Sequence, residues 1–137
     1  MIIGVLKEPV PETRVSLLAE AVAAVTKKGW EVWVEPGAGI NAFCTDDAYV
    51  QAGASLKALP DILSGANIVL SIQQPAQPPA SGAVLIGMYQ ALLHKEKMDA
   101  WTAAGVTVFS MELLPRTTRA QTMDILSSQA NIAGYKA

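Results

Sequence analysis

The sequence predicts an α/β fold in which an open, mostly parallel sheet is flanked by helices in three layers. Four or five short apolar runs, each of strand length, alternate with segments of helical periodicity, and glycines or prolines separate the two kinds of segment. Short, nearly continuous apolar runs between helices are typical of strands buried on both faces of a parallel sheet. The runs cover residues 2–6, 31–34, 67–72, 83–88 and 106–111.

The segment after the first run predicts a helix, so that the chain begins with a βαβ unit. An apolar stripe at helical spacing runs through Val15, Leu18, Val22 and Val25. Gly29 follows the stripe, where a glycine commonly ends a helix.

Two further helices follow from capping signals. Thr45 precedes Asp46 and Asp47, which predicts a helix that begins with a threonine cap and acidic residues in its first turn, and Gly53 ends it. Residues 94–104 predict the next helix, which Gly105 closes, whereas the proline-rich residues 73–81 predict a loop.

A final helix is expected near the end of the chain. Its weak stripe consists mostly of small side chains, namely Met123, Leu126, Ala130, Ala133 and Ala137. Small side chains allow another backbone to approach closely, so a packing partner is expected there.

The length and composition exclude several classes of protein. At 137 residues the chain predicts a single domain, residues 1–137. The net charge of −2 and the low charged fraction of 16% argue against nucleic acid as a partner. No apolar run approaches the roughly 18 residues of a membrane span, so direct membrane insertion is not expected. One cysteine, Cys44, and one histidine, His94, favour a reducing cytoplasm and argue against a metal site.

Polar side chains follow several of the predicted strands. In open α/β sheets, ligands bind beyond the carboxyl ends of the strands. The segments after the strands, residues 7–14, 73–75, 89–90 and 111–124, are therefore expected to meet at one edge of the sheet. This predicts a polar cleft that contains Arg14, Gln73, Gln90, Arg116, Gln121 and Asp124.

Three stretches resemble the alanine dehydrogenase and pyridine-nucleotide transhydrogenase family, and within it the alpha subunit of the transhydrogenases. They are IGVLKE with ETRVS (residues 3–8 and 12–16), VEPGAGINAFCTDDAYVQAGA (34–54) and PRTTRAQTMDILSSQANIAGYKA (115–137). The resemblance covers nearly the whole chain. It implies a flavodoxin-like or Rossmann-like domain, although this chain lacks the dinucleotide fingerprint G-x-G-x-x-G.

The resemblance implies roles for Arg116, Gln121 and Asp124 as the catalytic and cofactor-binding residues. They match a loop that holds the nicotinamide end of NAD(H) and faces the partner that binds NADP(H) during direct hydride transfer. The cofactors carry that chemistry, so the protein only has to orient the rings. Interpreted without the resemblance, the same stretch predicts only the start of a helix. Thr118 would then be its cap, Arg119 would be solvated, and Asp124 would pair with Arg119 or Arg116.

Arg14, Gln73 and Gln90 are the expected residues of the substrate pocket. From the local sequence alone, we expect Arg14 to form a salt bridge with Glu8 or Glu12. The resemblance instead implies that Arg14 contacts a substrate carboxylate, as in alanine dehydrogenases. Those enzymes place a lysine and a histidine where this chain has Gln73 and Gln90. Neither amide can transfer a proton, so alanine oxidation is not expected.

By resemblance, the chain is the first domain of a proton-translocating NAD(P) transhydrogenase alpha subunit and is inactive alone. The final helix would lead into an absent NAD-binding domain. The expected partners are that domain, the NADP-binding and membrane subunits, and a second copy in a homodimer. The location would be cytoplasmic, at the inner membrane through the partners. Two alternatives remain open: an alanine-dehydrogenase-like first domain, and a non-catalytic interaction module that assembles through the final helix and Trp33.

Overall fold

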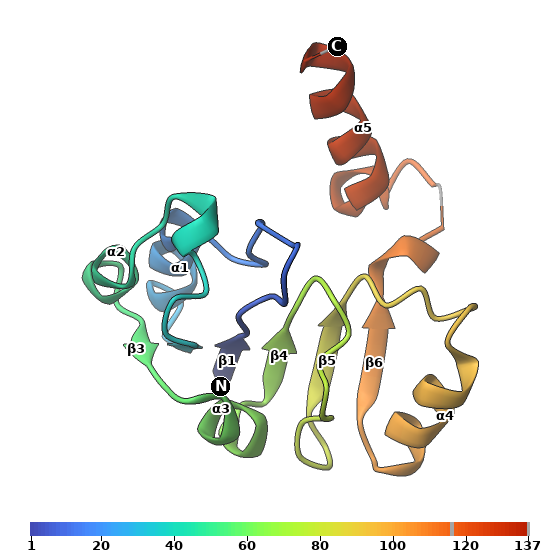
Figure 1. Cartoon of the computed structure of the whole chain (residues 1–137), viewed down its shortest axis with the longest axis horizontal. Helices are drawn as coiled ribbons and strands as arrows, with labels where there is room; N and C mark the ends of the chain where they lie inside the picture. Colours follow the sequence, from blue (N-terminus) through green and yellow to red (C-terminus); the bar gives the residue numbers. More distant parts are fainter. Residues whose placement is uncertain (116, 137) are drawn as a thin grey trace.

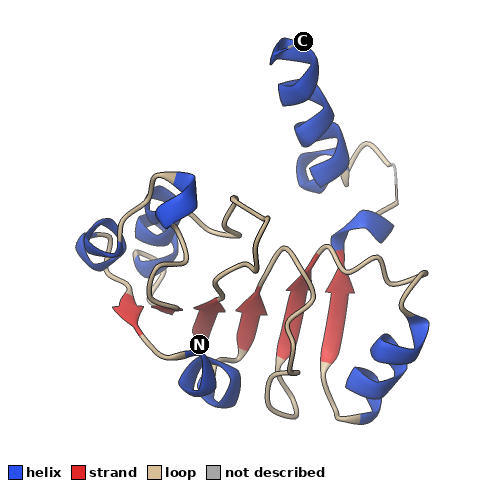
Figure 2. Ribbon diagram, in the orientation of Figure 1, coloured by secondary structure: helices blue, strands red, loops and turns tan. Residues whose placement is uncertain are grey.

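The described residues form one six-stranded sheet with every strand parallel to its neighbours (Figures 1 and 2). The computed structural model describes residues 1–115 and 117–136. The strands are β1 (Ile2–Val5), β2 (Glu31–Val34), β3 (Ser55–Leu56), β4 (Ile68–Leu70), β5 (Val84–Gly87) and β6 (Thr107–Ser110). Their spatial order is β3-β2-β1-β4-β5-β6, which is the order of a Rossmann-like sheet. The direction of winding reverses between β1 and β4, and this is the point where such sheets form a crevice.

All five predicted strands are present, each within two residues of the expected bounds. The sequence did not reveal β3 or the helix α3 (Leu59–Gly65) that follows it. Strand β3 has two residues, both exposed, so it carries no apolar run. Helix α3 is only about two turns long, and its signals are a proline near its start and Asp61 in its first turn.

The remaining helices are α1 (Ala19–Thr26), α2 (Asp46–Gln51), α4 (Lys95–Ala103) and α5 (Ile125–Lys136). Helices α2 and α4 agree with the predictions, and Thr45 caps α2 by accepting a hydrogen bond from the Ala48 N–H at 3.2 Å. The predicted first helix began too early, because Val15 lies in a loop and Leu18 is the residue before the helix. Val15 nevertheless packs against the core from that loop, which explains why it continued the apolar stripe.

Two buried clusters fill the two sides of the sheet. On the side that we call the α1 face, Val22 and Tyr49 of α1 and α2 pack on Val5, Val32 and Val34, all 0% exposed. On the opposite α3 face, α3 and α4 cover β1 and β4–β6; the central residues of this face include Ile62, Val69, Leu85, Tyr89 and Trp101.

The α1 face is covered over β1–β3 but not over β4–β6. The strand register places six side chains there in two rows beside the buried Ile3 and Val5: Ile68, Val84 and Thr107, then Leu70, Ile86 and Phe109. We call these six residues the open face. None of them belongs to either buried cluster of the described residues, and exposure rises from 0% at Val5 to 55% at Phe109. Figure 1 shows α1 and α2 at the β3 end of the sheet and α4 at the β6 end.

Helix α5 leaves the carboxyl edge of the sheet and projects away from it (Figure 1). It has no buried residue among those described, and Leu126, Ile132 and Tyr135 are exposed. The expected stripe is only partly helical, since Met123 lies in the short 3-10 helix η3 (Gln121–Met123) and Ala137 lies outside the described residues. No helix in residues 1–115 and 117–136 has the length and apolar character needed to cross a membrane.

Trp33 does not present a free aromatic face. Its ring packs so closely against α3 that a Cβ added at Gly65 would lie 2.7 Å from it, and the Lys57 ammonium lies 5.4 Å from the ring centroid. Its indole N–H donates to Glu31 at 2.6 Å. An interaction module that assembles through Trp33 therefore loses its proposed surface, because this ring is already half-buried by neighbours.

Candidate functional site

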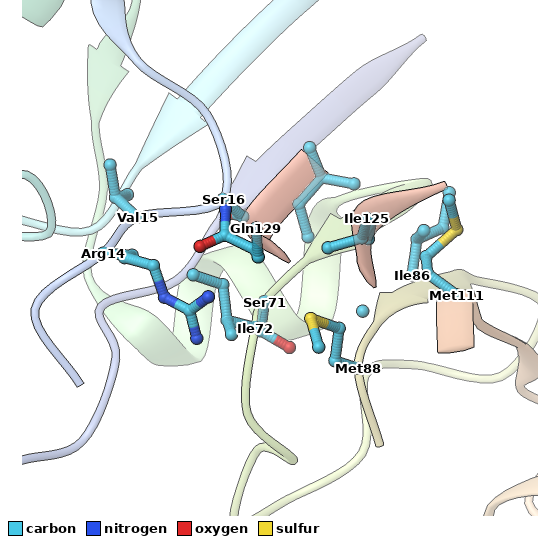
Figure 3. A pocket seen from close by; sticks show the side chains of 12 residues that line it. Arg14, Val15, Ser16, Ser71, Ile72, Ile86, Met88, Met111, Ile125 and Gln129 are labelled. Carbon is cyan, nitrogen blue, oxygen red and sulfur yellow. The ribbon is translucent and has the colours of Figure 1, made fainter. Parts of the chain in front are cut away.

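A cleft of about 320 Å³ lies at the point where the sheet reverses direction (Figure 3). Its floor includes the open-face residues Leu70 and Ile86. The loop after β1 and the first turns of α5 form its sides, and Met88 and Met111 line its far end. Most of the lining is apolar, and the polar groups are Arg14, Ser16, Ser71 and Gln129. This cleft suits a flat, mostly apolar group with a few polar atoms at its edge.

Arg14 is oriented by a carboxylate from its own loop. Its Nε and Nη2 donate to the two oxygens of Glu12 at 2.8 and 2.7 Å, and its guanidinium reaches toward Ser71 and Ile72 (Figure 3). The hydrogen bonds from Arg14 lower the pKa of Glu12 to about 2. The predicted salt bridge to Glu12 is therefore present. It uses Nε and Nη2 of Arg14 but not Nη1. Arg14 both holds the loop and lines the cleft.

Glu8 binds backbone instead of Arg14. Its carboxylate is only 8% exposed and accepts hydrogen bonds from the N–H groups of Ile72 and Gln73 at 2.5 and 2.8 Å. Burial raises the pKa of Glu8, although the two backbone hydrogen bonds oppose this effect. Glu8 thereby joins the loop after β1 to the loop after β4.

Two serines in the cleft wall differ in how their hydroxyls are satisfied. Ser71 Oγ lies 3.0 Å from the Tyr89 hydroxyl, which is itself buried beside Trp101. Ser16 Oγ is also buried but has no hydrogen-bond partner within the described parts of the chain. An unpaired buried hydroxyl costs free energy, so it favours a ligand atom that can pair with it.

The loops after β5 and β6 are joined by a second carboxylate. Glu112 Oε1 accepts from the Ala91 N–H at 3.0 Å and from Ser110 Oγ at 2.5 Å. Burial alone would raise the pKa of Glu112, but these hydrogen bonds outweigh it and the pKa lies below its usual value. The site therefore stands on loops that are cross-linked through acidic side chains.

Gln73 and Gln90 meet in a hollow separate from the cleft, together with Gln74, His94 and Lys97. Gln90 adopts a left-handed backbone conformation with φ of 49°, and its carbonyl accepts from Leu93 and His94. Left-handed conformations of residues other than glycine are uncommon and concentrate at functional sites. Both residues line this one hollow, but neither lines the cleft that contains Arg14, so the single cleft predicted for all of them is not present.

Gln121 and Asp124 line a third hollow, of about 340 Å³, with Pro115, Ala120 and Ser127. The Asp124 carboxylate accepts from the Ser127 N–H at 3.1 Å and from the Ser127 hydroxyl at 2.6 Å, so it caps the start of α5. The alternative cap, Thr118, is wrong because α5 begins at Ile125. Gln121 is exposed, and Arg116 lies outside the described residues.

The single polar cleft expected from the sequence is thus three neighbouring hollows at one edge of the sheet. The sequence reasoning missed Ser16, Ser71 and the role of Glu8 in joining two loops. Glu8 and Ser71 lie just beyond strands β1 and β4, whereas Ser16 lies shortly before α1. A polar residue directly after a strand was the available signal for Glu8 and Ser71, but burial at these positions is visible only in the fold. It also missed that apolar side chains dominate the central cleft.

Comparison with known proteins shows similarity to two groups of proteins, the alanine dehydrogenases and the NAD(P) transhydrogenase alpha subunits. The family model described as "Alanine dehydrogenase/PNT, N-terminal domain" matches residues 4–133. The first portion of NAD(P) transhydrogenase subunit alpha from Rhodospirillum rubrum is 41% identical over 100% of this chain. Alanine dehydrogenase of Bacillus subtilis is 30% identical over 100% of the chain. The chain spans 38% and 37% of the length of these two relatives, respectively.

The fold agrees with the crystal structure of a transhydrogenase from Sinorhizobium meliloti. The TM-score is 0.93 with 40% identity, and the match covers 100% of this chain and 42% of that chain. The agreement extends over all the elements that surround the cleft.

Proposed function

We propose, because the chain belongs to the family of alanine dehydrogenase/PNT N-terminal domains, that it is the N-terminal domain of a NAD(P) transhydrogenase alpha subunit. In this proposal the cleft at the sheet reversal forms part of the binding site for the nicotinamide end of NAD(H). The higher identity to the transhydrogenase relative, 41% against 30% for the alanine dehydrogenase, favours this branch.

The observation that carries the proposal is the Ser16 hydroxyl, which lies in a largely apolar cleft and has no partner among the described residues. A nicotinamide ring is flat and carries a single carboxamide. Leu70, Ile86 and Met88 would contact the ring, while Ser16 and Gln129 would pair with the carboxamide or with ribose hydroxyls. The residues present therefore fit the group.

Arg14 is the one titratable side chain among the described residues that line the cleft. NAD(H), when bound, supplies the hydride or accepts it at the nicotinamide ring. Transfer between two nicotinamides needs orientation and exclusion of water but no acid or base from the protein. In the proposal the apolar lining keeps water away from a bound ring, and the Arg14 guanidinium, oriented by its ion pair with Glu12, presents hydrogen-bond donors at the edge.

Gln121, Asp124 and Arg116 are proposed to act at the boundary with the partner that carries NADP(H). Gln121 is exposed near the start of α5, and Asp124 fixes that start by capping it. In the proposal Asp124 sets the direction of α5, whose Ile125 and Gln129 line the cleft, and Gln121 orients the ring from the side. NAD-binding, NADP-binding and membrane parts would complete the enzyme, which would be a homodimer.

The alternative function, amino acid oxidation through Arg14, has one observation in its favour, since this guanidinium reaches into the cleft. Against it, Gln73 and Gln90 offer no proton transfer and face a separate hollow. A small carboxylate would also have to compete with Glu12 for Arg14. Competition by pyruvate therefore distinguishes the two functions.

The test is a titration of the ¹⁵N-labelled chain with NADH, followed by amide chemical shifts, which detect binding as weak as millimolar. We expect saturable shifts around Ser16, Ile86 and Met88, without competition from pyruvate. Replacement Ser16→Ala should weaken binding about threefold to tenfold, the effect of one hydrogen bond. The matched control is Ser64→Ala, because Ser64 lies on α3 and donates to the Pro60 carbonyl at 2.8 Å. Shifts confined to other regions, or none at millimolar NADH, would overturn the proposal.

A further inference from the structure

The carboxylate of Glu8 is the most buried charged group among the described residues, and the proposed reaction does not use it. Its two oxygens accept from two successive backbone N–H groups, those of Ile72 and Gln73, which lie 64 and 65 residues away along the chain. The buried Glu8 carboxylate therefore acts as acceptor for two backbone N–H groups that in a continuing strand would pair with backbone carbonyls.

These two N–H groups need a partner because the sheet ends there. The last backbone bond in this direction between β1 and β4 runs from the Leu6 N–H to the Leu70 carbonyl at 3.1 Å. Beyond it the two loops separate, since the chain turns toward β2 after β1 and toward β5 after β4. Without Glu8, two backbone donors at the base of the crevice would lose their acceptor, at a cost of about 1–3 kcal/mol each.

A chain of contacts continues from Glu8 to the cleft. Ile72, whose N–H Glu8 holds, is itself part of the cleft lining. Gln73 and Glu12 line the same small hollow, and the Gln73 side chain contributes to the lowered pKa of Glu12. Glu12 in turn holds Arg14 through two hydrogen bonds. Both ends of this chain, Ile72 and Arg14, face the same cleft.

We propose that Glu8 is the positioning residue of this cleft, whose carboxylate fixes Ile72 directly and Arg14 through Gln73 and Glu12. This inference rests on the proposed function in one respect, namely that the cleft binds the nicotinamide end of NAD(H). The two hydrogen bonds from the Ile72 and Gln73 amides to Glu8, which we call the clamp, do not depend on the ligand and can be measured without it.

The clamp has a spectroscopic signature. Protonation of Glu8 would weaken both hydrogen bonds together, so the amide protons of Ile72 and Gln73 should shift at one common pH. The charged and titratable groups that act on Glu8 are Glu12 and Arg14 from its own loop and Tyr89 from the loop after β5. Burial raises the pKa of Glu8, so we expect the common inflection above the usual value for a glutamate.

The experiment compares Glu8→Gln with Glu35→Gln. Glu35 is a matched control because it also accepts a backbone N–H, that of Lys7 at 2.8 Å, but does not line the cleft. We expect the common inflection of Ile72 and Gln73 to vanish in E8Q and to persist in E35Q. Affinity for NAD⁺, which tolerates acid, should fall about tenfold in E8Q and stay unchanged in E35Q, with both variants measured at a temperature at which each is fully folded.

A second measurement covers the case in which E8Q does not fold. In the unaltered chain, the affinity for NAD⁺ should then decrease as the pH is lowered through the value at which the Ile72 and Gln73 amides shift. Separate inflections for the two amides, or none, would overturn the clamp. A common inflection with unchanged NAD⁺ affinity, while Ser16→Ala still weakens binding, would overturn the positioning role and leave the proposed function standing. Failure of the unaltered chain to bind NAD⁺ would overturn the proposed function and the positioning role that rests on it, whatever the amides of Ile72 and Gln73 show.

Discussion

The two ends of the sheet use similar strands but are covered differently. Over β1–β3, helices lie on both faces, and Val5, Val32 and Val34 are completely buried. Over β4–β6, α3 and α4 cover one face, where Val69 and Leu85 are also completely buried. The other side of the same strands is the open face, which ends at a Phe109 side chain that is 55% exposed.

This difference places the candidate site. A cleft forms where cover by α1 and its loop stops and the open face begins, since Leu70 and Ile86 belong to both the open face and the cleft lining. The same alternation of residues along a strand thus produces a buried core on one side and a partly exposed apolar surface on the other. Adjacent residues of one strand allow the contrast to be measured directly.

Leu85 and Ile86 provide the largest expected difference. Leu85→Ala should lower the free energy of unfolding by about 2–5 kcal/mol, because it removes a completely buried side chain. Ile86→Ala, one residue later on the open face, should cost less, about 1–2 kcal/mol, because the Ile86 side chain is partly exposed. Urea unfolding of both variants measures this. Equal losses would show that the open face is covered in solution, for example by a second copy.

Two helical glycines test the same contrast at the backbone. Gly65→Ala would place a Cβ 2.7 Å from the Trp33 ring, so we expect a loss of about 1–3 kcal/mol from overpacking. At Gly134 in α5 nothing lies within 4 Å of the added carbon. Gly134→Ala should therefore stabilise α5 by about 0.5–1 kcal/mol. Thermal unfolding measures the effect of Gly65→Ala, and hydrogen exchange of the α5 amides measures the effect of Gly134→Ala. A destabilised Gly134→Ala variant would mean that α5 is packed against another surface.

The capping residues Thr45 and Asp124 give the smallest effects. Thr45→Ala removes the cap of α2, which packs in the core, and should lower global stability by about 1 kcal/mol. Asp124→Ala removes the cap of α5, which has no buried residue, so we expect faster amide exchange in α5 with nearly unchanged global unfolding. Urea unfolding and hydrogen exchange together measure both. A comparable global loss from Asp124→Ala would contradict the independence of α5 from the core.

Much of the architecture could be predicted because it depends on local pattern. The apolar runs predicted five strands, and Thr45 with Asp46 and Asp47 predicted the start of α2. Where a short element carries no pattern, as in the two residues of β3, only pairing with β2 creates it. The start of α1 was predicted too early because Val15 fits the apolar stripe. Val15 lies in a loop, but a loop residue can pack against the core as well as a helical one.

The candidate site was predictable as a region but not as a set of contacts. Parallel topology required the loops after the strands to share one edge of the sheet, and Arg14, Gln73, Gln90, Gln121 and Asp124 do lie there. Their division among three hollows depends on how the loops turn after leaving the sheet. For Glu8, the sequence offered a salt bridge with Arg14, whereas the fold brings backbone donors 64 residues away within its reach.

By itself, the sequence determined the fold class, the parallel strands and the residue types available at the carboxyl edge, because periodicity and capping are properties of neighbours along the chain. The tertiary structure alone decided which face of β4–β6 is open, that the buried Ser16 hydroxyl has no partner within the described residues, and that Glu8 joins two loops. Each of these depends on contacts between segments distant in sequence. Burial and hydrogen-bond satisfaction are determined by the whole fold, so no local pattern could have revealed them.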